Sequence, residues 1–304
     1  MTIDFKGRVA IVTGAGGGLG QQHALALARR GAKVVVHDLG AARDGSAGSA
    51  GAAQAVVDQI VAAGGEAIAN GASVTDYTSV QAMVQQAMDA WGWVDILVNN
   101  AGILRDKSFA KMELEDFRLV MDVHLMGAVH CSKAVWPIMT AQKYGRIVMT
   151  TSSTGLYGNF GQSSYGAAKM ALVGLMQTLS IEGAKNDIRV NCLAPTAATR
   201  MTEGLMPDAV LQALTPEAVV PAMLVLAARD APNRCILCAG AGTFEAAHIT
   251  LTNGLWIGAD EQTPEQLTQR LAEVRNRLGE TVPESGAAQG SNELAKAMAH
   301  RART

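Results

Sequence analysis

A run of glycines directly follows a short apolar segment near the start of the chain, and this combination constrains the fold more than any other feature. Val9-Ala-Ile-Val-Thr13 is apolar without alternation, which is typical of a strand buried on both faces. Thr13-Gly-Ala-Gly-Gly-Gly-Leu-Gly20 comes next and opens a helical pattern that ends at Gly31. A buried strand, a glycine turn and a helix in this order predict the first unit of a layered α/β protein.

The alternation of strand-like runs and longer helical patterns continues along the chain. Strands are expected at 33–38, 66–74, 94–98, 146–150, 188–191 and 234–239, and helices at 52–63, 79–91, 114–142 and 163–182. Parallel strands need crossover connections, which the helices supply. The order therefore predicts an α/β fold with a doubly wound parallel sheet of the Rossmann type, helices on both of its faces, and a C-terminal helical extension.

The chain length of 304 residues would suit two average domains, but the pattern favours a different division. Residues 1–242 contain every predicted strand and are expected to form one domain. Residues 243–304 are expected to be an extension rather than an independent domain. In that extension Thr263-Pro-Glu-Gln266 reads as a capping box and starts a docked helix at about 263–279, and a loose tail begins at about 282.

The charge balance excludes one class of partner. Lys and Arg number 25 against 27 Asp and Glu, with no basic run, so a nucleic-acid-binding surface is not expected. No apolar stretch reaches the roughly 18 residues that a membrane span needs, so no membrane partner is expected either. The first residues do not resemble a signal peptide, and Ala302-Arg-Thr304 does not resemble a peroxisomal address.

The cysteine pattern predicts neither disulfides nor a metal site. Cys235 and Cys238 are spaced as C-x-x-C, but no second pair and no nearby histidine completes a metal-ligand set. Cys131 and Cys192 stand alone, so all four cysteines are interpreted as small buried apolar residues. We expect no metal and a cytoplasmic location.

The glycine turn is a candidate phosphate site. Gly14, Gly18 and Gly20 fit one known spacing, and Gly14, Gly17 and Gly20 fit another, so the run alone is weak evidence. Asp38 strengthens it, because an acidic residue stands at the end of the second predicted strand. A carboxylate accepts hydrogen bonds from ribose hydroxyls and repels the 2′-phosphate of NADP by about 1 kcal/mol for each charge pair in a wet site. The sequence therefore favours NAD.

A second group of residues indicates acid–base chemistry. Tyr165 and Lys169 lie four residues apart on one face of a predicted helix, and Ser152 follows a predicted strand end. An isolated Y-x-x-x-K is common and usually forms a surface pair. A tyrosine has a pKa near 10, and an ammonium at about 5 Å supplies about 3 kcal/mol toward lowering it. Lys169 is therefore expected to lower the pKa of Tyr165.

Together with Asn99-Asn-Ala-Gly102, these motifs resemble the short-chain dehydrogenase/reductase family from about residue 5 to 242. The resemblance implies that Ser152 binds the substrate oxygen, that Tyr165 exchanges the hydroxyl proton, and that Lys169 also holds the nicotinamide ribose. His124 stands where the family has a relay asparagine, and a buried structural histidine is an equal interpretation. The cofactor site implied in this way consists of Thr13, Gly14, Gly18, Leu19, Gly20, Asp38, Ser73, Val74, Asn100, Ala101, Gly102, Tyr165, Lys169, Pro195 and Thr199.

Several segments narrow the resemblance to one branch. Among them are Val36-His-Asp-Leu-Gly40 with the long Gly/Ala/Ser insert at 40–51, Lys143-Tyr-Gly-Arg-Ile147 and Tyr157-Gly-Asn-Phe-Gly-Gln162. They are similar to the (3R)-hydroxyacyl-CoA dehydrogenase part of the peroxisomal multifunctional enzyme type 2. This similarity implies NAD-dependent oxidation of a 3-hydroxyacyl-CoA to a 3-ketoacyl-CoA.

Three alternatives stay open for the function. The substrate is either an acyl-CoA or a steroid-like or other secondary alcohol without CoA, since one site can serve many alcohols. A non-catalytic sensor that only binds NAD is the alternative from another class, and Ser152, Tyr165 and Lys169 argue against it. The resemblance also implies a homodimer or homotetramer in which the helices near 114–142 and 163–182 pair between subunits.

Overall fold

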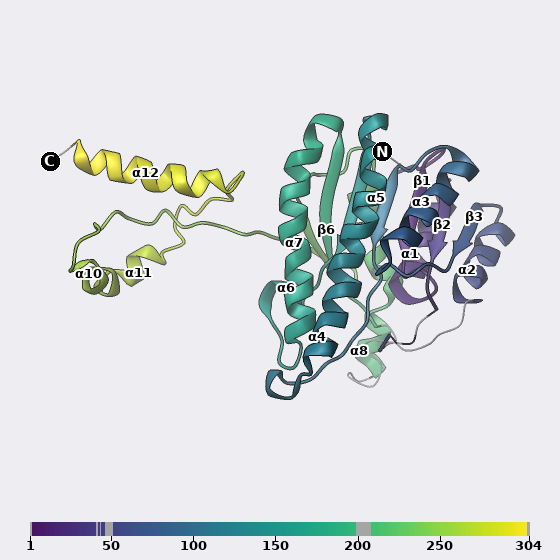
Figure 1. Cartoon of the computed structure of the whole chain (residues 1–304), viewed down its shortest axis with the longest axis horizontal. Helices are drawn as coiled ribbons and strands as arrows, with labels where there is room; N and C mark the ends of the chain where they lie inside the picture. Colours follow the sequence, from purple (N-terminus) through teal and green to yellow (C-terminus); the bar gives the residue numbers. More distant parts are fainter. Residues whose placement is uncertain (1, 41, 43, 46–50, 199–207, 303–304) are drawn as a thin grey trace. The chain divides into compact units, whose positions relative to one another are not determined.

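The computed structural model describes residues 2–40, 42, 44–45, 51–198 and 208–302 of the chain (Figure 1). Contacts between residues divide it into two compact units, Met1–Ala246 and Ala247–Thr304. This division falls close to the predicted boundary at residue 242. Every residue of the candidate site that the structure describes belongs to the first unit.

An eight-stranded sheet forms the centre of the first unit, in the order β3-β2-β1-β4-β5-β6-β7-β8. The strands are β1 (Val9–Thr13), β2 (Lys33–His37), β3 (Glu66–Asn70), β4 (Ile96–Asn99), β5 (Gly145–Thr150), β6 (Ile188–Thr196), β7 (Ile236–Gly240) and β8 (Thr243–Ala247). The first seven pair in parallel. The strand order reverses between β1 and β4, and ligands of such sheets bind beyond the carboxyl ends of the strands at this reversal.

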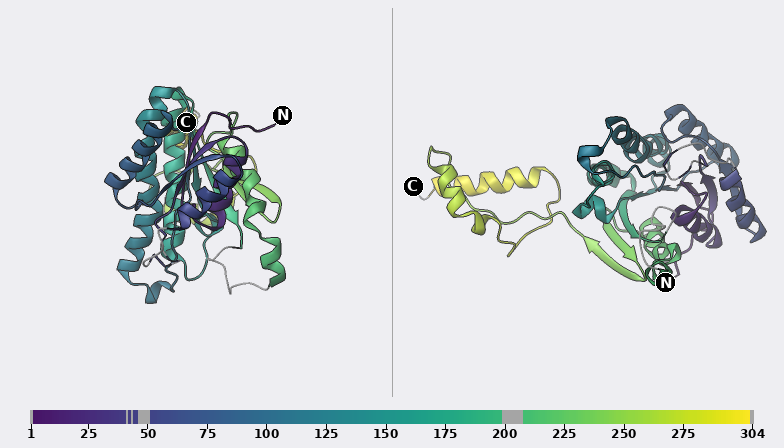
Figure 2. Two further views of the ribbon diagram at one scale, coloured as in Figure 1. Left: turned by 90° about the vertical axis from the view of Figure 1, so that its right-hand side faces the viewer. Right: turned by 90° about the horizontal axis from the view of Figure 1, so that it is seen from below.

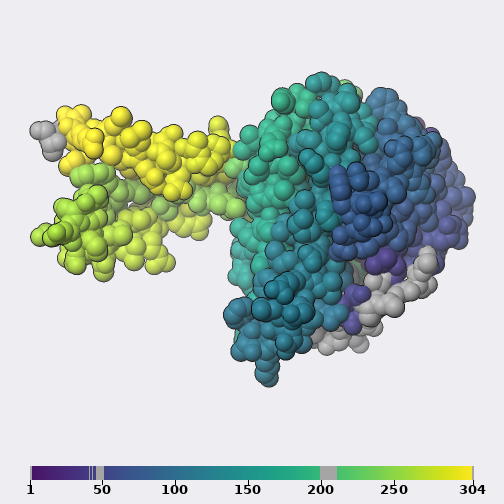
Figure 3. Space-filling view, viewed as in Figure 1, coloured from purple at the N-terminus to yellow at the C-terminus, as the bar shows by residue number. Residues whose placement is uncertain are grey.

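Helices cover both faces of this sheet, as the two views of Figure 2 show. One layer contains α1 (Gly18–Arg29), α2 (Gly51–Ala62) and α9 (Val220–Ala227), and the other contains α3 (Tyr77–Trp91), α4 (Leu114–Met121), α5 (Gly127–Gln142) and α7 (Ser163–Gly183). In the space-filling view, helices of the second layer form much of the face turned toward the viewer (Figure 3). Shorter helices are α6 (Ser153–Tyr157), α8 (Asp208–Ala213), η1 (Phe109–Lys111), η3 (Ala184–Asn186) and η4 (Pro216–Val219).

The apolar runs of the sequence form the core because the strands are covered on both sides. All five residues of β1 and all six of β5 are buried. The predicted doubly wound parallel sheet with helices on both faces is confirmed.

Some boundaries differ from the prediction. The strand expected at 66–74 ends at Asn70, and the expected helix at 114–142 contains a π-helical turn, η2 (Asp122–Met126), between α4 and α5. Strand β8 was not predicted. It follows β7 through Ala241 and Gly242, which have φ angles of 49° and 76°, and such a two-residue turn joins antiparallel neighbours.

The second unit contains more helix than expected. The expected helix at 263–279 is two short helices, α10 (Thr263–Gln269) and α11 (Leu271–Val274), and α12 (Ala287–Arg301) occupies most of the stretch predicted to be a loose tail. The predicted capping box is not formed, because the hydroxyl of Thr263 donates to the carboxylate of Asp260. The rings of Trp256 and His300 stack with centroids 3.6 Å apart. Whether the extension folds independently stays a prediction.

Neither a membrane helix nor a metal cluster was found in the residues that the structure describes. No helix there is both long and apolar enough to cross a bilayer. No group of three His, Cys, Asp or Glu side chains in these ranges could hold a metal ion.

Candidate active site

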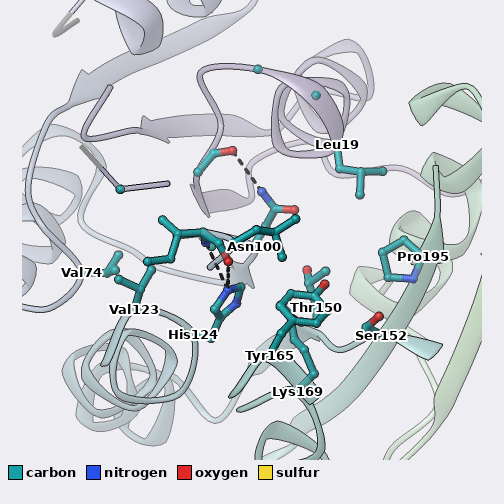
Figure 4. A pocket seen from close by; sticks show the side chains of 18 of the residues that line it. Leu19, Val74, Asn100, Val123, His124, Thr150, Ser152, Tyr165, Lys169 and Pro195 are labelled. Carbon is teal, nitrogen blue, oxygen red and sulfur yellow. Dashed lines mark hydrogen bonds between the residues drawn. The ribbon is translucent and has the colours of Figure 1, made fainter. Parts of the chain in front are cut away.

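One cavity of about 610 Å³ lies along the carboxyl ends of the strands and connects the two predicted groups of residues. The glycine turn and Asp38 line one part of it, and Ser152, Tyr165 and Lys169 line another. Figure 4 shows Ser152, Tyr165 and Lys169 together on one side of this cavity, with Asn100 toward the glycine turn. The structure therefore brings the nucleotide-type turn and the acid–base group into one space.

Several glycines of this turn are packed so closely that a side chain at their positions would not fit. Gly14 has a φ of +64°, and a Cβ there would lie 2.8 Å from the Cα of Ala101. A Cβ on Gly20 would lie 2.1 Å from the carbonyl oxygen of Gly14. Gly17 precedes α1 and gives the helix no side-chain cap. The first amide groups of α1 therefore remain available at the positive end of the helix, which suits the pyrophosphate of a dinucleotide.

Asp38 braces this turn from the end of β2. One carboxylate oxygen accepts the N–H of Gly16 at 2.8 Å, and the other accepts the N–H of Gly40 at 2.7 Å. A Cβ on Gly16 would lie 2.8 Å from the same carboxylate, so only glycine allows this approach. The negative charge of Asp38 is thus held at the wall of the cavity.

The loop after β4 is tied to the turn from the other side. The side-chain amide of Asn100 donates to the carbonyl groups of Thr13 and Gly14, both at 3.0 Å. The hydroxyl of Thr13 accepts the N–H groups of Asn100 and Ala101 at 3.0 and 3.1 Å. These contacts fix the backbone on both sides of the strand-order reversal, and they explain why Thr13 and Asn100 occur at those positions.

Ser152 and Tyr165 both line the cavity, and they lie at the starts of two consecutive helices, α6 and α7. Ser152 caps α6, because its hydroxyl oxygen accepts the N–H of Thr154 at 3.2 Å. Tyr165 lies in the first turn of α7. Burial raises the pKa of the Tyr165 phenol above 10, and a hydrogen bond with Ser152 opposes that increase. The expected lowering of the Tyr165 pKa by Lys169 is therefore not found in the chain by itself.

The environment of Lys169 explains this difference. Its Nζ donates to the carbonyl oxygen of Thr150 at 2.6 Å and lies 5.5 Å from the centroid of the Tyr165 ring. The residue is 3% exposed, and burial lowers the pKa of Lys169 from 10.5 to about 7. Sequence spacing alone revealed the pair but not its desolvation. Desolvation therefore shifts the pKa values of both groups in the direction that favours their neutral forms.

His124 occupies the π-helical turn, a feature that frequently marks functional sites. Its Nε2 lies 2.8 Å from the carbonyl oxygen of Ile103 and 3.1 Å from the amide nitrogen of the same residue. Burial and the charge of Lys169 lower its pKa from 6.5 to about 3, so the ring is neutral. Its Nδ1 is buried and has no hydrogen-bond partner among the described residues.

A cavity of about 10 Å³ adjoins His124 and is also lined by Asn99 and Lys169. That volume is close to the space that one water needs. The Oδ1 of Asn99, like Nδ1 of His124, is buried without a partner within the described ranges. Gly102 makes room for the imidazole, since a Cβ there would lie 2.3 Å from its Cε1.

Most of the remaining predicted residues also line the main cavity. Thr13 and Gly20 do not, and Thr13 lines the small cavity instead. Leu19, Ser73, Val74, Ala101, Gly102 and Pro195 contribute to its wall, and so does Gly18. The hydroxyl of Ser73 is engaged with Thr75 at 2.8 Å. Thr199 lies outside the described residues. Thr150 and His37, which sequence reasoning did not select, also line the cavity.

Comparison with known proteins identifies the relatives of this arrangement. The profile of the short chain dehydrogenase family matches residues 8–209. The peroxisomal multifunctional enzyme A of Dictyostelium discoideum is 45% identical over 296 residues, which cover 97% of this chain and 66% of that protein. This chain therefore spans less than two thirds of that relative.

Solved structures agree with these relatives. Full-length peroxisomal multifunctional enzyme type 2 from Drosophila melanogaster matches 98% of this chain and 50% of its own, with a TM-score of 0.80 and 36% identity. A 7α-hydroxysteroid dehydrogenase in complex with NADH and 7-oxo glycochenodeoxycholic acid matches 79% of this chain and 95% of its own. Its TM-score is 0.71 and its identity 31%.

Proposed function

The chain belongs to the short-chain dehydrogenase family and is an oxidoreductase acting on CH–OH groups, and from this premise we propose that it oxidises a 3-hydroxyacyl-CoA to the 3-ketoacyl-CoA with NAD. The observation that carries the proposal is the single cavity shared by the glycine turn, Asp38, Ser152, Tyr165 and Lys169. The relatives that are named multifunctional enzymes and the branch-specific segments of the sequence favour the acyl-CoA substrate.

The described residues fit a nicotinamide dinucleotide, and NADH in the hydroxysteroid dehydrogenase supports this cofactor class. The uncapped α1 and the glycine turn would hold the pyrophosphate, and Asp38 would accept the ribose hydroxyls. Its charge favours NAD over NADP, because the 2′-phosphate would face a carboxylate whose position two backbone amides fix. When bound, the oxidised nicotinamide supplies the hydride acceptor.

The side chains at the other part of the cavity handle the substrate oxygen and its proton. Ser152 would donate a hydrogen bond to that oxygen through its hydroxyl hydrogen, while its oxygen accepts the N–H of Thr154. Tyr165 would act as the phenolate, whose oxygen takes the hydroxyl proton while the hydride leaves the carbinol carbon for the oxidised nicotinamide. An ammonium on Lys169 would stabilise that phenolate before the transfer, because an ammonium stabilises an adjacent anion most in a desolvated site.

His124 extends this proton path in the proposal. One water in the small cavity would bond to Nδ1 of His124 and to Oδ1 of Asn99, which otherwise stay unsatisfied within the described residues. Lys169 also lines the cavity that this water would occupy. A neutral His124 passes a proton by accepting and donating hydrogen bonds rather than by holding a charge.

A hydroxysteroid or other secondary alcohol is the second candidate substrate. The specific observation that favours it is the fold match to a 7α-hydroxysteroid dehydrogenase over 95% of that chain. A non-catalytic NAD sensor is disfavoured, because a protein that only binds NAD has no need of Ser152, Tyr165 and Lys169 around the same cavity.

We further propose that the chain works as a homodimer or homotetramer. The cytoplasmic location also stays a proposal, and the two multifunctional enzymes named above are peroxisomal by name.

The test is an NADH absorbance assay with a panel of 3-hydroxyacyl-CoAs, matched free 3-hydroxy acids and hydroxysteroids. The expected result is turnover of the acyl-CoA with NAD at a kcat/KM at least tenfold above that of the free acid. The Tyr165→Phe variant should bind NADH with unchanged affinity and lose turnover. Turnover of hydroxysteroids alone would support the second candidate substrate. NADH binding without turnover of any substrate would support a non-catalytic sensor.

A further inference from the structure

We propose that His37 and His130 are positioning residues for the adenine end of the nucleotide, because each holds a backbone carbonyl of the segment 72–74 that walls the cavity beyond Asp38. The proposal rests on the proposed use of NAD. In this proposal, two histidines outside the acid–base group contribute to the affinity for the cofactor.

The order of the strands decides which end of the nucleotide reaches this segment. Ser152 and Tyr165 follow β5, on one side of β1, whereas Asp38 and the segment 72–74 follow β2 and β3 on its other side. A pyrophosphate at the glycine turn after β1 places its two nucleosides on opposite sides of that turn. Since the reacting end must reach Tyr165, the adenine end lies over β2 and β3.

The segment 72–74 needs side chains to hold it. The ladder between β2 and β3 ends with the pair His37 and Asn70, and no strand or helix continues through Ala72 and Ser73. Carbonyl groups past the end of a ladder have lost their regular donors. Imidazole nitrogens replace those donors here, at 2.7 Å from the oxygen of Ala72 and 2.8 Å from the oxygen of Val74.

His37 acts from the last position of β2. The residue is 2% exposed, and burial lowers its pKa, which favours the neutral ring. A carbonyl oxygen only accepts hydrogen bonds, so the proton of this neutral ring is on Nε2, which faces Ala72. The next residue is Asp38. The end of β2 therefore carries both the Asp38 carboxylate, which is proposed to bind the ribose, and the His37 N–H, which holds the carbonyl of Ala72.

His130 acts from α5. Its Nδ1 donates to the carbonyl of Val74, and the Tyr77 ring lies 5.5 Å from the imidazole, tilted by 47°. The side chain of Val74 packs on the same helix, where Gly127 leaves space: a Cβ there would lie 2.7 Å from a Val74 methyl group. Val74 is thus held at its carbonyl and at its side chain.

These contacts predict an effect on nucleotide affinity that is confined to the adenine half. Without one donor the segment can move, and its contact with the base weakens. The loss of one hydrogen bond typically corresponds to a roughly threefold to tenfold change in an equilibrium constant. The chemistry at Tyr165 takes place at the other end of the cavity.

The experiment uses the full chain and measures binding of AMP, nicotinamide mononucleotide and NADH by calorimetry, together with steady-state kinetics. His130→Leu removes the donor, and His130→Asn restores an amide nitrogen near the position of Nδ1. His37→Phe and His37→Gln form the matched pair for Nε2. We expect the donor-free variants to bind AMP and NADH about threefold to tenfold more weakly, with nicotinamide mononucleotide unaffected and the loss in KM for NAD rather than in kcat. The amide variants should recover most of the affinity.

Two results would overturn the inference. One is unchanged AMP affinity in His130→Leu. Because His130 is only half-buried, this variant should fold even where His37→Phe does not, and its result is decisive. The other is equal weakening of AMP and nicotinamide mononucleotide, which would indicate general loosening of the fold. A wild-type chain that binds neither AMP nor NADH would instead remove the proposed NAD function, and the inference with it.

Discussion

The ring of His124 stands edge-on to the ring of Tyr165, with centroids 5.2 Å apart and planes at 88°. The contact links the proposed acid–base tyrosine to a histidine whose pKa burial lowers to about 3. A histidine this acidic does not take up a proton at neutral pH. In the proposed relay it acts as a neutral hydrogen-bonding group next to Tyr165 and Lys169.

The first prediction separates the contribution of His124 ring packing to catalysis from the contribution of its hydrogen-bonding nitrogens. His124→Phe keeps an aromatic edge against Tyr165 and removes the hydrogen-bonding atoms, so kcat should fall about tenfold or more. His124→Asn restores a polar group and should recover most of that loss. NADH affinity serves as the control and should change less than twofold. Full kcat in His124→Phe would show that the histidine only fills space.

A related pH test follows from the direction of this pKa. The pKa of about 3 lies far below the unperturbed 6.5. The pH–rate profile between pH 5 and 9 should therefore contain no ionisation that disappears in His124→Asn. An ionisation near pH 6.5 that the substitution removes would contradict a neutral relay.

The second prediction concerns the cost of burying Lys169. Because its pKa in the folded chain is about 7 and that of a free lysine is 10.5, the unfolded chain binds more protons between these values. Wild-type stability should accordingly rise as pH increases from 7 toward 10.5. Lys169→Met removes that dependence and should stabilise the protein by about 2 kcal/mol at pH 7, after allowing for the lost bond to Thr150. Thermal unfolding should show a higher Tm together with lost turnover, whereas a lower Tm would contradict the burial argument.

The strands and the site motifs were predictable because the relevant signals are local. A fully apolar run such as Val9–Thr13 can only be covered on both sides, and the glycine turn after it admits no side chain at Gly20. The order of strand and helix patterns then predicted the parallel sheet and brought Ser152, Tyr165 and Lys169 to the same edge as Asp38.

Features that depend on tertiary burial were not predictable in this way. The pKa of Tyr165 is raised by desolvation, which the spacing to Lys169 does not reveal. The π-helical turn around His124 has no residue signature of its own. Strand β8 was missed because its residues are largely exposed, so it shows no apolar face, and α12 has no buried residue within the described ranges that would produce a stripe.

The third prediction tests the nucleotide preference at Asp38. Asp38→Asn removes the charge but keeps an oxygen that can accept the N–H of Gly16 or Gly40. The ratio of kcat/KM for NAD to that for NADP should fall at least about tenfold, because repulsion of the 2′-phosphate is lost. Asp38→Ala removes the brace as well and should also weaken NAD binding. An unchanged ratio in Asp38→Asn would mean that the charge does not select the nucleotide.

The fourth prediction is acid sensitivity caused by His23 in α1. This side chain is 0% exposed, neither of its nitrogens has a hydrogen-bond partner in the described residues, and burial lowers its pKa from 6.5 to about 4. Below pH 6.5 the unfolded chain binds the extra proton, so stability falls as pH decreases from 6.5 toward 4, by about 3 kcal/mol in all. Urea unfolding at pH 7.5 and pH 5 should show a smaller loss in His23→Leu than in the wild type. His248→Leu, at an exposed position, is the matched control.

The fifth prediction compares two glycines in helices. A Cβ on Gly20 would lie 2.1 Å from the backbone oxygen of Gly14 and 2.6 Å from the side-chain nitrogen of Asn100, so Gly20→Ala must displace the turn. A Cβ on Gly174, inside α7, meets nothing within 4 Å, and Gly174→Ala should stabilise the protein by about 0.5–1 kcal/mol through helix propensity. We expect Gly20→Ala to weaken NADH binding at least about tenfold, whereas Gly174→Ala leaves it unchanged and raises the Tm. Equal NADH affinities in the two variants would show that the close approach of α1 to Gly14 does not shape the nucleotide site.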